Sequence, residues 1–206
     1  MLLAIDTSAG SSVAVVDRDR GVLADRSIDD TMRHAEVIGT LIDEALHEAG
    51  VAVGDLSAVA AGMGPGPFTG LRVGIAAARA FAIGADIPLV SLVSHDAVAR
   101  ERYGTGASGG LLVVTDARRR EVYWSAYDGL DDSGIPIRVD GPGLCKPDAL
   151  PHADLQRVDA ASVSAAELGM LAELMYAHGR PFAVDQPLYL RSPDVTLASG
   201  PKRVTA

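Results

Sequence analysis

The sequence has little cysteine, few aromatic residues and an excess of negative charge. Its single cysteine, Cys145, excludes a disulfide scaffold or a cysteine-based zinc site within one chain, and we expect it to be a small apolar filler. Aromatic residues make up only 4% although 48% of the chain is hydrophobic, which predicts a core of small side chains in a mixed α/β protein. The formal charge of −9 makes the chain a poor lone binder of nucleic acid, because phosphate neutralisation needs clustered Lys and Arg. Any role on RNA is therefore expected to depend on a partner.

Long hydrophobic segments, targeting signals and metal-ligand clusters are lacking too. No apolar run approaches the length expected of a membrane span. The opening MLLAIDTS has no basic region and soon meets Asp6, so we expect no signal peptide and a cytoplasmic protein with no membrane partner. No HExxH pattern exists, which excludes a metallopeptidase of that type. No histidine has a partner at ligand spacing, so we predict no metal and no cofactor.

The most specific stretch is GPGPFTGLRVG, residues 64–74. It follows an apolar run and opens into Ala-rich sequence, an order that predicts a strand, a tight loop and a helix beginning near Pro67. Gly70, Gly74 and Ala78 recur every four residues on one face of that helix. So small a face lets another backbone approach closely, which indicates a contact surface.

A phosphate-binding loop is the alternative interpretation of this stretch. A Walker loop needs Gly-Lys-Ser/Thr at its end, and no Lys is present here. Pro65 and Pro67 also remove two backbone N–H donors from the anion site that a helix N-terminus offers. We therefore favour the structural interpretation, with nucleotide binding as the alternative.

Hydrophobic periodicity predicts the elements of the first half. Apolar runs separated by short turns predict a β-meander, and the helical spacing that follows has Asp30 or Thr31 as its cap and Gly50 as its end. The expected strands are 2–7, 12–17, 21–28, 56–63 and 88–92, and the expected helices are 33–49, 67–84 and 95–102.

The second half repeats this outline in shorter form after a Gly/Ser/Thr linker at 105–110. A capping box of Ser164 and Glu167 predicts the start of the last helix. The expected strands are 111–115, 121–127 and 135–139, followed by a helix at 164–177, an extended segment at 186–191 and a mobile tail from 192. We place an N-terminal lobe at 1–104 and a smaller C-terminal lobe at 105–206. Two such lobes predict an α/β fold of the actin, sugar-kinase and Hsp70-ATPase (ASKHA) type with a reduced second lobe.

Four motifs carry a resemblance to a known family. They are AIDTS at the start, GPGPFTGLRVG, DARRREVYW at 116–124 and PLYLR at 187–191. Together they resemble the bacterial tRNA threonylcarbamoyladenosine biosynthesis proteins TsaB (YeaZ type), over nearly the whole chain. The glycine motif is the most specific of the four.

The resemblance implies a non-catalytic subunit of the tRNA N6-threonylcarbamoyladenosine (t6A) modification complex. Such proteins pair with a larger catalytic paralogue, TsaD, through the two helices of the first lobe, and TsaE joins that complex. It implies contact with tRNA only through the complex, and a homodimer on the same surface when TsaD is absent. The expected interface residues are His34, Ile38, Leu41, Ile42, Ala45, Phe68, Leu71, Arg72, Gly74, Ile75 and Ala78.

A small-molecule kinase or ATPase of the same fold is the alternative. In that fold the first turn cradles phosphate, so Asp6, Thr7 and Ser8 are candidate nucleotide or anion contacts, with Arg118 from the later turn. Asp6 equally fits an Asp that caps its own turn. The Gly-rich adenosine turn that the second lobe would need is missing. In the catalytic paralogue two histidines four apart bind metal, whereas here His34 is followed by Ile38, so we predict no catalytic residue.

Overall fold

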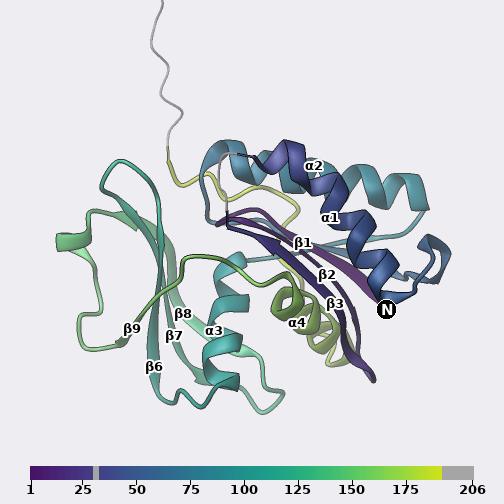
Figure 1. Cartoon of the computed structure of the whole chain (residues 1–206). Helices are drawn as coiled ribbons and strands as arrows, with labels where there is room; N and C mark the ends of the chain where they lie inside the picture. Colours follow the sequence, from purple (N-terminus) through teal and green to yellow (C-terminus); the bar gives the residue numbers. More distant parts are fainter. Residues whose placement is uncertain (30–32, 192–206) are drawn as a thin grey trace, which may run out of the picture.

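The structure is a computed structural model that describes residues 1–29 and 33–191, and its core consists of two β-sheets with helices around them (Figure 1). The caps expected at Asp30 or Thr31 and the tail expected from 192 lie outside the described residues. The first sheet has the strand order β3-β2-β1-β4-β5. Its strands are β1 (Leu2–Asp6), β2 (Ser11–Asp17), β3 (Gly21–Ile28), β4 (Ala58–Gly62) and β5 (Leu89–Leu92).

The first three strands form the predicted meander. β1 pairs antiparallel with β2 and parallel with β4. Every residue of β1 is buried, because both faces of this sheet are covered. Alternate side chains enter two different cores: Leu3 and Ile5 face one side, and Leu2 and Ala4 face the other.

Helices α1 (His34–Ala49) and α2 (Phe68–Ala85) lie side by side on one face of the first sheet (Figure 1). Helix α4 (Ala165–Ala177) covers the opposite face and packs against α3 (Ser94–Gly104). The small residues of that face allow α4 to approach closely, since a Cβ on Gly169 would lie 3.0 Å from the Cβ of Ala4. These four helices match the sequence-based prediction within two residues at either end.

The second sheet has the order β8-β7-β6-β9. Its strands are β6 (Gly110–Asp116), β7 (Val122–Leu130), β8 (Pro136–Cys145) and β9 (Gln156–Asp159). Strand β8 is longer than the segment 135–139 predicted for it. Strand β9 was not predicted, because Gln156–Asp159 is short and holds one apolar residue. One face of this sheet packs against α3. Within residues 1–29 and 33–191 the other face is covered by Leu150 and Leu155 and not by a helix, so the second lobe is reduced.

The two sheets share a hydrophobic core. Residues from β1, β2, α3, α4, β6 and β7 form one buried cluster. Helix α4 lies after the boundary proposed at 104/105 yet covers the first sheet. We retain that boundary as a proposal for where the second sheet begins, while the packing joins the lobes into one unit.

Helix α2 corrects one expectation. By length and composition alone it is apolar enough to cross a membrane, although no such segment was expected from the sequence. A core helix of a globular protein passes the same test, and α2 packs on the first sheet. Only 33% of this helix is buried within the chain, so an apolar helix surface is left uncovered.

Candidate functional site

The glycine motif joins β4 to α2 and packs directly on the end of β1. A Cβ on Gly66 would lie 2.7 Å from the Cα of Ser8, and one on Gly74 would lie 2.2 Å from Oγ1 of Thr7. Only a residue without a side chain fits at either position. The Thr7 hydroxyl donates to the Gly70 carbonyl at 2.7 Å and accepts from the Gly74 N–H at 3.1 Å. The small face of α2 is therefore an internal contact that fixes α2 on β1.

A buried carboxylate organises the same corner. Oδ1 of Asp6 accepts from the backbone N–H of Ser8 at 2.7 Å and from its hydroxyl at 2.5 Å. Oδ2 accepts from the Ser94 hydroxyl at 2.5 Å, and that hydroxyl in turn accepts from the Gly64 N–H at 3.0 Å. Burial raises the pKa of Asp6, and these hydrogen bonds oppose the rise. The network joins β1, the glycine loop and the start of α3.

The first three residues expected at an anion contact are buried and hydrogen-bonded within the chain. Asp6, Thr7 and Ser8 are each at most 3% exposed, and their polar groups are used in the hydrogen bonds just described. Arg118 lies instead on the exposed turn between β6 and β7, where its backbone N–H donates to Asp116 at 2.9 Å. Of the two interpretations weighed for Asp6, the Asp that caps its own turn is the one the structure shows.

His34 is also an interior residue. Its side chain is 7% exposed, and Nδ1 lies 2.7 Å from the Ser11 hydroxyl. A Cβ on Gly70 would lie 3.0 Å from Nε2 of His34, so the ring fills the space that this glycine leaves. The histidine holds the start of α1 against β2 and α2.

Most of the residues expected at the partner interface are buried within the chain. Of its eleven residues, eight lie inside the chain and face the first sheet or its edge, since the widest apolar stripe of each helix packs on its own sheet. These eight are His34, Ile38, Leu41, Ala45, Leu71, Gly74, Ile75 and Ala78. Phe68 and Arg72 are exposed, and Ile42 is half-buried.

The side of α2 that is turned away from the sheet nevertheless carries small and apolar residues. On α1 the small exposed residues are Ala35 and Gly39, and the rest of its outward side is polar and largely acidic. Ala76 and Ala80 are exposed on α2, Ile83 is 81% exposed, and a Cβ on Gly39 of α1 would meet nothing within 4 Å. Such a face allows another helix to pack closely. We define the helix-pair face by eight exposed or half-buried residues of the two helices: Ala35, Gly39, Ile42, Arg72, Val73, Ala76, Ala80 and Ile83.

An aromatic cluster borders the helix-pair face. The guanidinium carbon of Arg72 lies 3.6 Å from the centroid of the Phe68 ring, whose centroid is 4.8 Å from that of Tyr189. Nε of Arg72 also donates to the Tyr189 hydroxyl at 3.3 Å. The segment that carries Tyr189 is attached beside β4, because the Leu188 N–H donates to the Met63 carbonyl at 2.8 Å. The PLYLR motif is thus a strap across the base of α2, a role that its sequence did not show.

A second buried histidine connects the two sheets. His95 of α3 is fully buried, with Nδ1 2.8 Å from the Ser125 hydroxyl and Nε2 2.9 Å from the Thr115 hydroxyl. Burial, with a smaller effect of the Arg138 charge, lowers the pKa of His95 to about 3. The ring is therefore neutral at physiological pH and serves to hold α3 on the second sheet.

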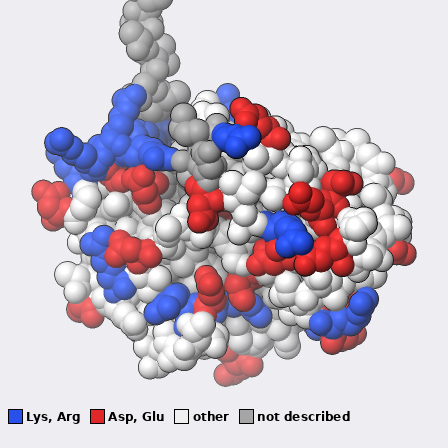
Figure 2. Space-filling view, viewed as in Figure 1, with Lys and Arg blue, Asp and Glu red and all other residues white. Residues whose placement is uncertain are grey.

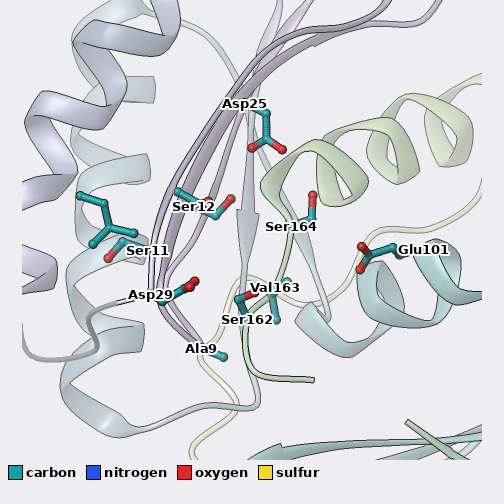
Figure 3. A pocket seen from close by; sticks show the side chains of 11 residues that line it. Ala9, Ser11, Ser12, Asp25, Asp29, Glu101, Ser162, Val163 and Ser164 are labelled. Atoms are coloured by element: carbon teal, nitrogen blue, oxygen red, sulfur yellow. The ribbon is translucent and has the colours of Figure 1, made fainter. Parts of the chain in front are cut away.

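One small polar pocket lies between the lobes, where β2 and β3 meet the start of α4 (Figure 3). Its volume is about 90 Å³, the space of roughly three water molecules. Serine hydroxyls line it together with the carboxylates of Asp25, Asp29 and Glu101. Burial, Glu167 and Glu48 raise the pKa of Asp25, which indicates an environment unfavourable to anions. Among the described residues no group of three or more His, Cys, Asp or Glu side chains is placed to hold a metal ion.

The strand order, the α1/α2 layer and the second, smaller sheet define a two-lobed α/β protein of the ASKHA type with a reduced second lobe. The YeaZ structure from Pseudomonas aeruginosa has the same fold, with a TM-score of 0.74 and 26% identity over 92% of this chain and 99% of that one.

Sequence comparisons identify the family to which the chain belongs. The family model for TsaD, tRNA N6-adenosine threonylcarbamoyltransferase, matches residues 22–150. TsaB of Escherichia coli is 27% identical, covering 93% of this chain and 94% of its own. An uncharacterised protein of Mycobacterium tuberculosis is 40% identical, covering 94% and 92%. The chain therefore belongs to the TsaD family, and within it to the TsaB/YeaZ type.

Proposed function

We propose that this protein is the non-catalytic scaffold subunit of a t6A tRNA-modification complex, and that it binds a TsaD partner through the helix-pair face. The observation that carries the proposal is the apolar, small-residue surface of α2, with the small exposed residues Ala35 and Gly39 on the adjacent α1, which the chain itself does not cover. A face of this kind on a folded domain marks an interaction site.

The kinship with TsaD supports the choice of occupant. Residues 22–150, which match the TsaD model, include both helices. A paralogue would present a related pair of helices, and two such pairs can pack face to face in a pseudo-symmetric dimer. Small residues at Gly39, Ala76 and Ala80 permit the close approach of helix axes that this arrangement needs.

The interior chemistry supports a scaffold rather than an enzyme. His34, at the position where the paralogue's metal-binding pair would begin, is buried and bonded to Ser11. The interlobe pocket is small and acidic, which does not suit the phosphates of ATP. No specific observation favours the alternative kinase or ATPase.

Other properties belong to the same proposal. TsaE joins the complex through TsaD, tRNA is engaged by the assembled complex, and the subunit works in the cytoplasm. When TsaD is absent, the uncovered helix-pair face packs against a second copy of the chain.

The test places two arginines on the helix-pair face. Ala76→Arg/Ala80→Arg should weaken binding to the cognate TsaD at least tenfold, because bulky charged side chains block close helix packing. Ala177→Arg is the matched control, since Ala177 is an exposed alanine of α4 on the opposite side of the first sheet. Light scattering after size-exclusion chromatography measures complex formation, and calorimetry measures its Kd.

Two outcomes would contradict the proposal. Unchanged binding of the double variant would show that TsaD binds elsewhere. Absence of a complex with the unaltered chain, together with ATP turnover by that chain alone, would favour the enzyme.

A further inference from the structure

The turn between β6 and β7 holds three consecutive arginines, Arg118, Arg119 and Arg120, all of them exposed. Their φ angles are +64°, +52° and +62°, the left-handed conformation that residues with a Cβ rarely adopt. Runs of such residues persist where the surrounding contacts hold them, and they are frequent at functional sites.

Contacts on both sides fix this turn. The Ala117 N–H donates to the Glu121 carbonyl at 3.0 Å, and the Glu121 N–H donates to the Arg118 carbonyl at 3.0 Å. From outside the turn, Nη1 of Arg191 donates to the Ala117 carbonyl at 3.0 Å. Nη2 of Arg191 forms an ion pair with Glu121 at 3.0 Å, and Nη1 of Arg118 lies 3.8 Å from the Asp116 carboxylate. Arg191 therefore holds the base of the arginine turn (residues 116–120), which presents three consecutive exposed arginines.

The arginine turn is continuous with the helix-pair face. Arg191 follows Tyr189, which is stacked in the cluster with Phe68 and Arg72 at the base of α2. The Tyr123 hydroxyl of β7 also donates to the Gly66 carbonyl in the glycine loop at 3.2 Å. Figure 2 shows Lys and Arg side chains gathered at its upper left, over the end of the second sheet where β6 and β7 turn in Figure 1.

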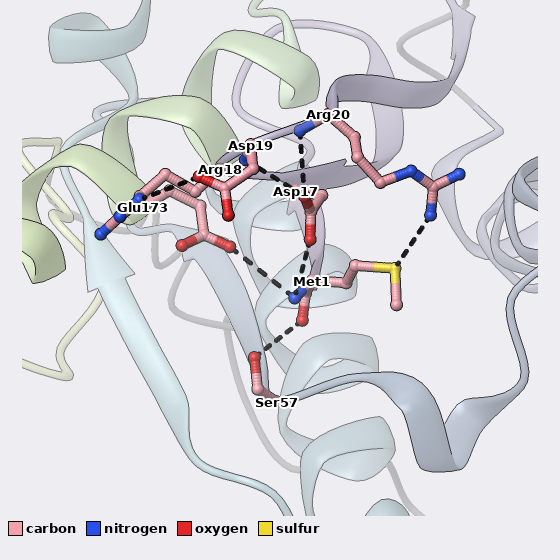
Figure 4. Close-up of polar contacts among 7 residues, drawn as sticks. All are labelled: Met1, Asp17, Arg18, Asp19, Arg20, Ser57 and Glu173. Carbon is pink, nitrogen blue, oxygen red and sulfur yellow. Dashed lines mark hydrogen bonds and ion pairs between the residues drawn. The ribbon is translucent and has the colours of Figure 1, made fainter.

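A hairpin turn of the first sheet also carries arginines, but it is built differently. Between β2 and β3, Asp17 accepts from the N–H groups of Asp19 and Arg20, and the Arg18 guanidinium lies 3.6 Å from Asp19 (Figure 4). Carboxylates alternate with arginines there. In the arginine turn the three positive residues are adjacent, which is an arrangement suited to an extended polyanion.

We propose that the arginine turn, held in place by Arg191, contacts the phosphate backbone of tRNA when the chain is assembled with its TsaD partner. Arginine matches phosphate through paired N–H donors.

RNA is favoured over an acidic protein because the turn has no exposed apolar residue. Ala117 is 1% exposed, whereas protein interfaces need buried apolar anchors. Phosphate contacts need only the guanidinium groups. The chain's charge of −9 explains why this contact depends on the complex. The inference rests on the proposed function.

The test measures binding of a fluorescently labelled tRNA transcript to the purified complex at several salt concentrations. Arg119→Gln/Arg120→Gln should weaken tRNA binding about tenfold near 150 mM salt and reduce the slope of log K against log salt by about one to two. Arg119→Lys/Arg120→Lys should retain part of the affinity because it keeps the charge. Arg18→Gln/Arg20→Gln, at the β2–β3 turn, is the control with equal loss of charge and should bind as the unaltered complex does.

Assembly with TsaD is measured first, so that the two proposals fail separately. A complex that assembles and binds tRNA normally with the Gln variant would overturn the phosphate contact and leave the scaffold function standing. Loss of assembly in the Gln variant would reassign the turn to a protein contact and overturn the inference. If the unaltered chain does not assemble with TsaD, the proposed function falls, and the inference with it.

Discussion

Glycine at position 74 is required by packing inside the chain. The residue forms no part of the outer surface, and its N–H bonds to Thr7. We therefore expect Gly74→Ala to lower the free energy of unfolding by about 1–3 kcal/mol, because the added methyl would overlap Oγ1 of Thr7. Urea denaturation of the isolated protein measures this loss.

Gly39 provides the matched control for Gly74. It lies within α1, and a Cβ there would meet nothing within 4 Å. Gly39→Ala should raise the free energy of unfolding by about 0.5–1 kcal/mol, through lower chain entropy of the unfolded state and better helix propensity. Equal effects of the two substitutions would show that the contact between α2 and β1 is looser than described.

His95 makes stability depend on pH. Its pKa is about 3 in the folded chain and near 6.5 when unfolded, so below pH 6.5 the unfolded state takes up a proton that the folded state does not. This contribution to stability is complete above pH 6.5 and is lost as the pH falls toward 3, at about 1.4 kcal/mol per pH unit. Asp6 and Asp96 act in the opposite direction, because burial raises their pKa values.

Comparison with His95→Gln isolates the histidine from those carboxylates. Gln can still bond to Thr115 but has no titratable group. Between pH 7 and pH 5 the unaltered protein should lose about 2 kcal/mol more unfolding free energy than the variant. Urea titrations at both pH values measure it, and parallel losses in the two proteins would show that His95 is accessible to protons when folded.

At the scale of elements, the strap at 187–191 should matter more for binding than for folding. Tyr189 is 39% exposed, so Tyr189→Ala should cost only about 0.5–1 kcal/mol of stability through loss of its contacts with Phe68 and Arg72. If the cluster is an anchor at the edge of the helix-pair face, the same change should weaken TsaD binding about tenfold or more. Tyr176→Ala, at an exposed position on α4, should change neither stability nor binding. Equal calorimetric Kd values for both variants would show that the strap takes no part in TsaD binding.

The sequence predicts where the helices and strands lie better than it predicts which face of each helix is buried. Helix α2 was located correctly because a strand, a glycine turn and an Ala-rich run occur in order. Its buried face was not, because Ala and Gly occur all round this helix and its polar side is marked only by Thr69, Arg72 and Arg79. The role of the strap was missed since Tyr189 and Arg72 are far apart in sequence. Strand β9 was missed because its composition does not favour a strand. Its extended conformation depends on pairing with β6, which the sequence does not show.

At the scale of the whole molecule, the shared core determines how the lobes unfold. Residues on α4 pack into the first sheet, and the N-terminal amine lies 3.6 Å from Asp17 and 3.9 Å from Glu173 of α4 (Figure 4). His95 and Tyr123 join the second sheet to α3 and to the glycine loop. Heat or urea should therefore unfold the full chain in one cooperative transition.

The same packing predicts the behaviour of the N-terminal lobe alone. A fragment of residues 1–104 keeps the first sheet with α1, α2 and α3 but loses α4, which leaves Ala4, Ala14 and Val16 exposed on the sheet's second face. We expect this fragment to bind the dye ANS and to lack a sharp thermal transition, because the hydrophobic stabilisation of that face is lost. Adding residues 160–191 in trans should restore the transition if α4 is the missing cover. A fragment that folds cooperatively without α4 would instead show that the boundary at 104/105 separates two independent domains, and that the core between the sheets adds little to stability.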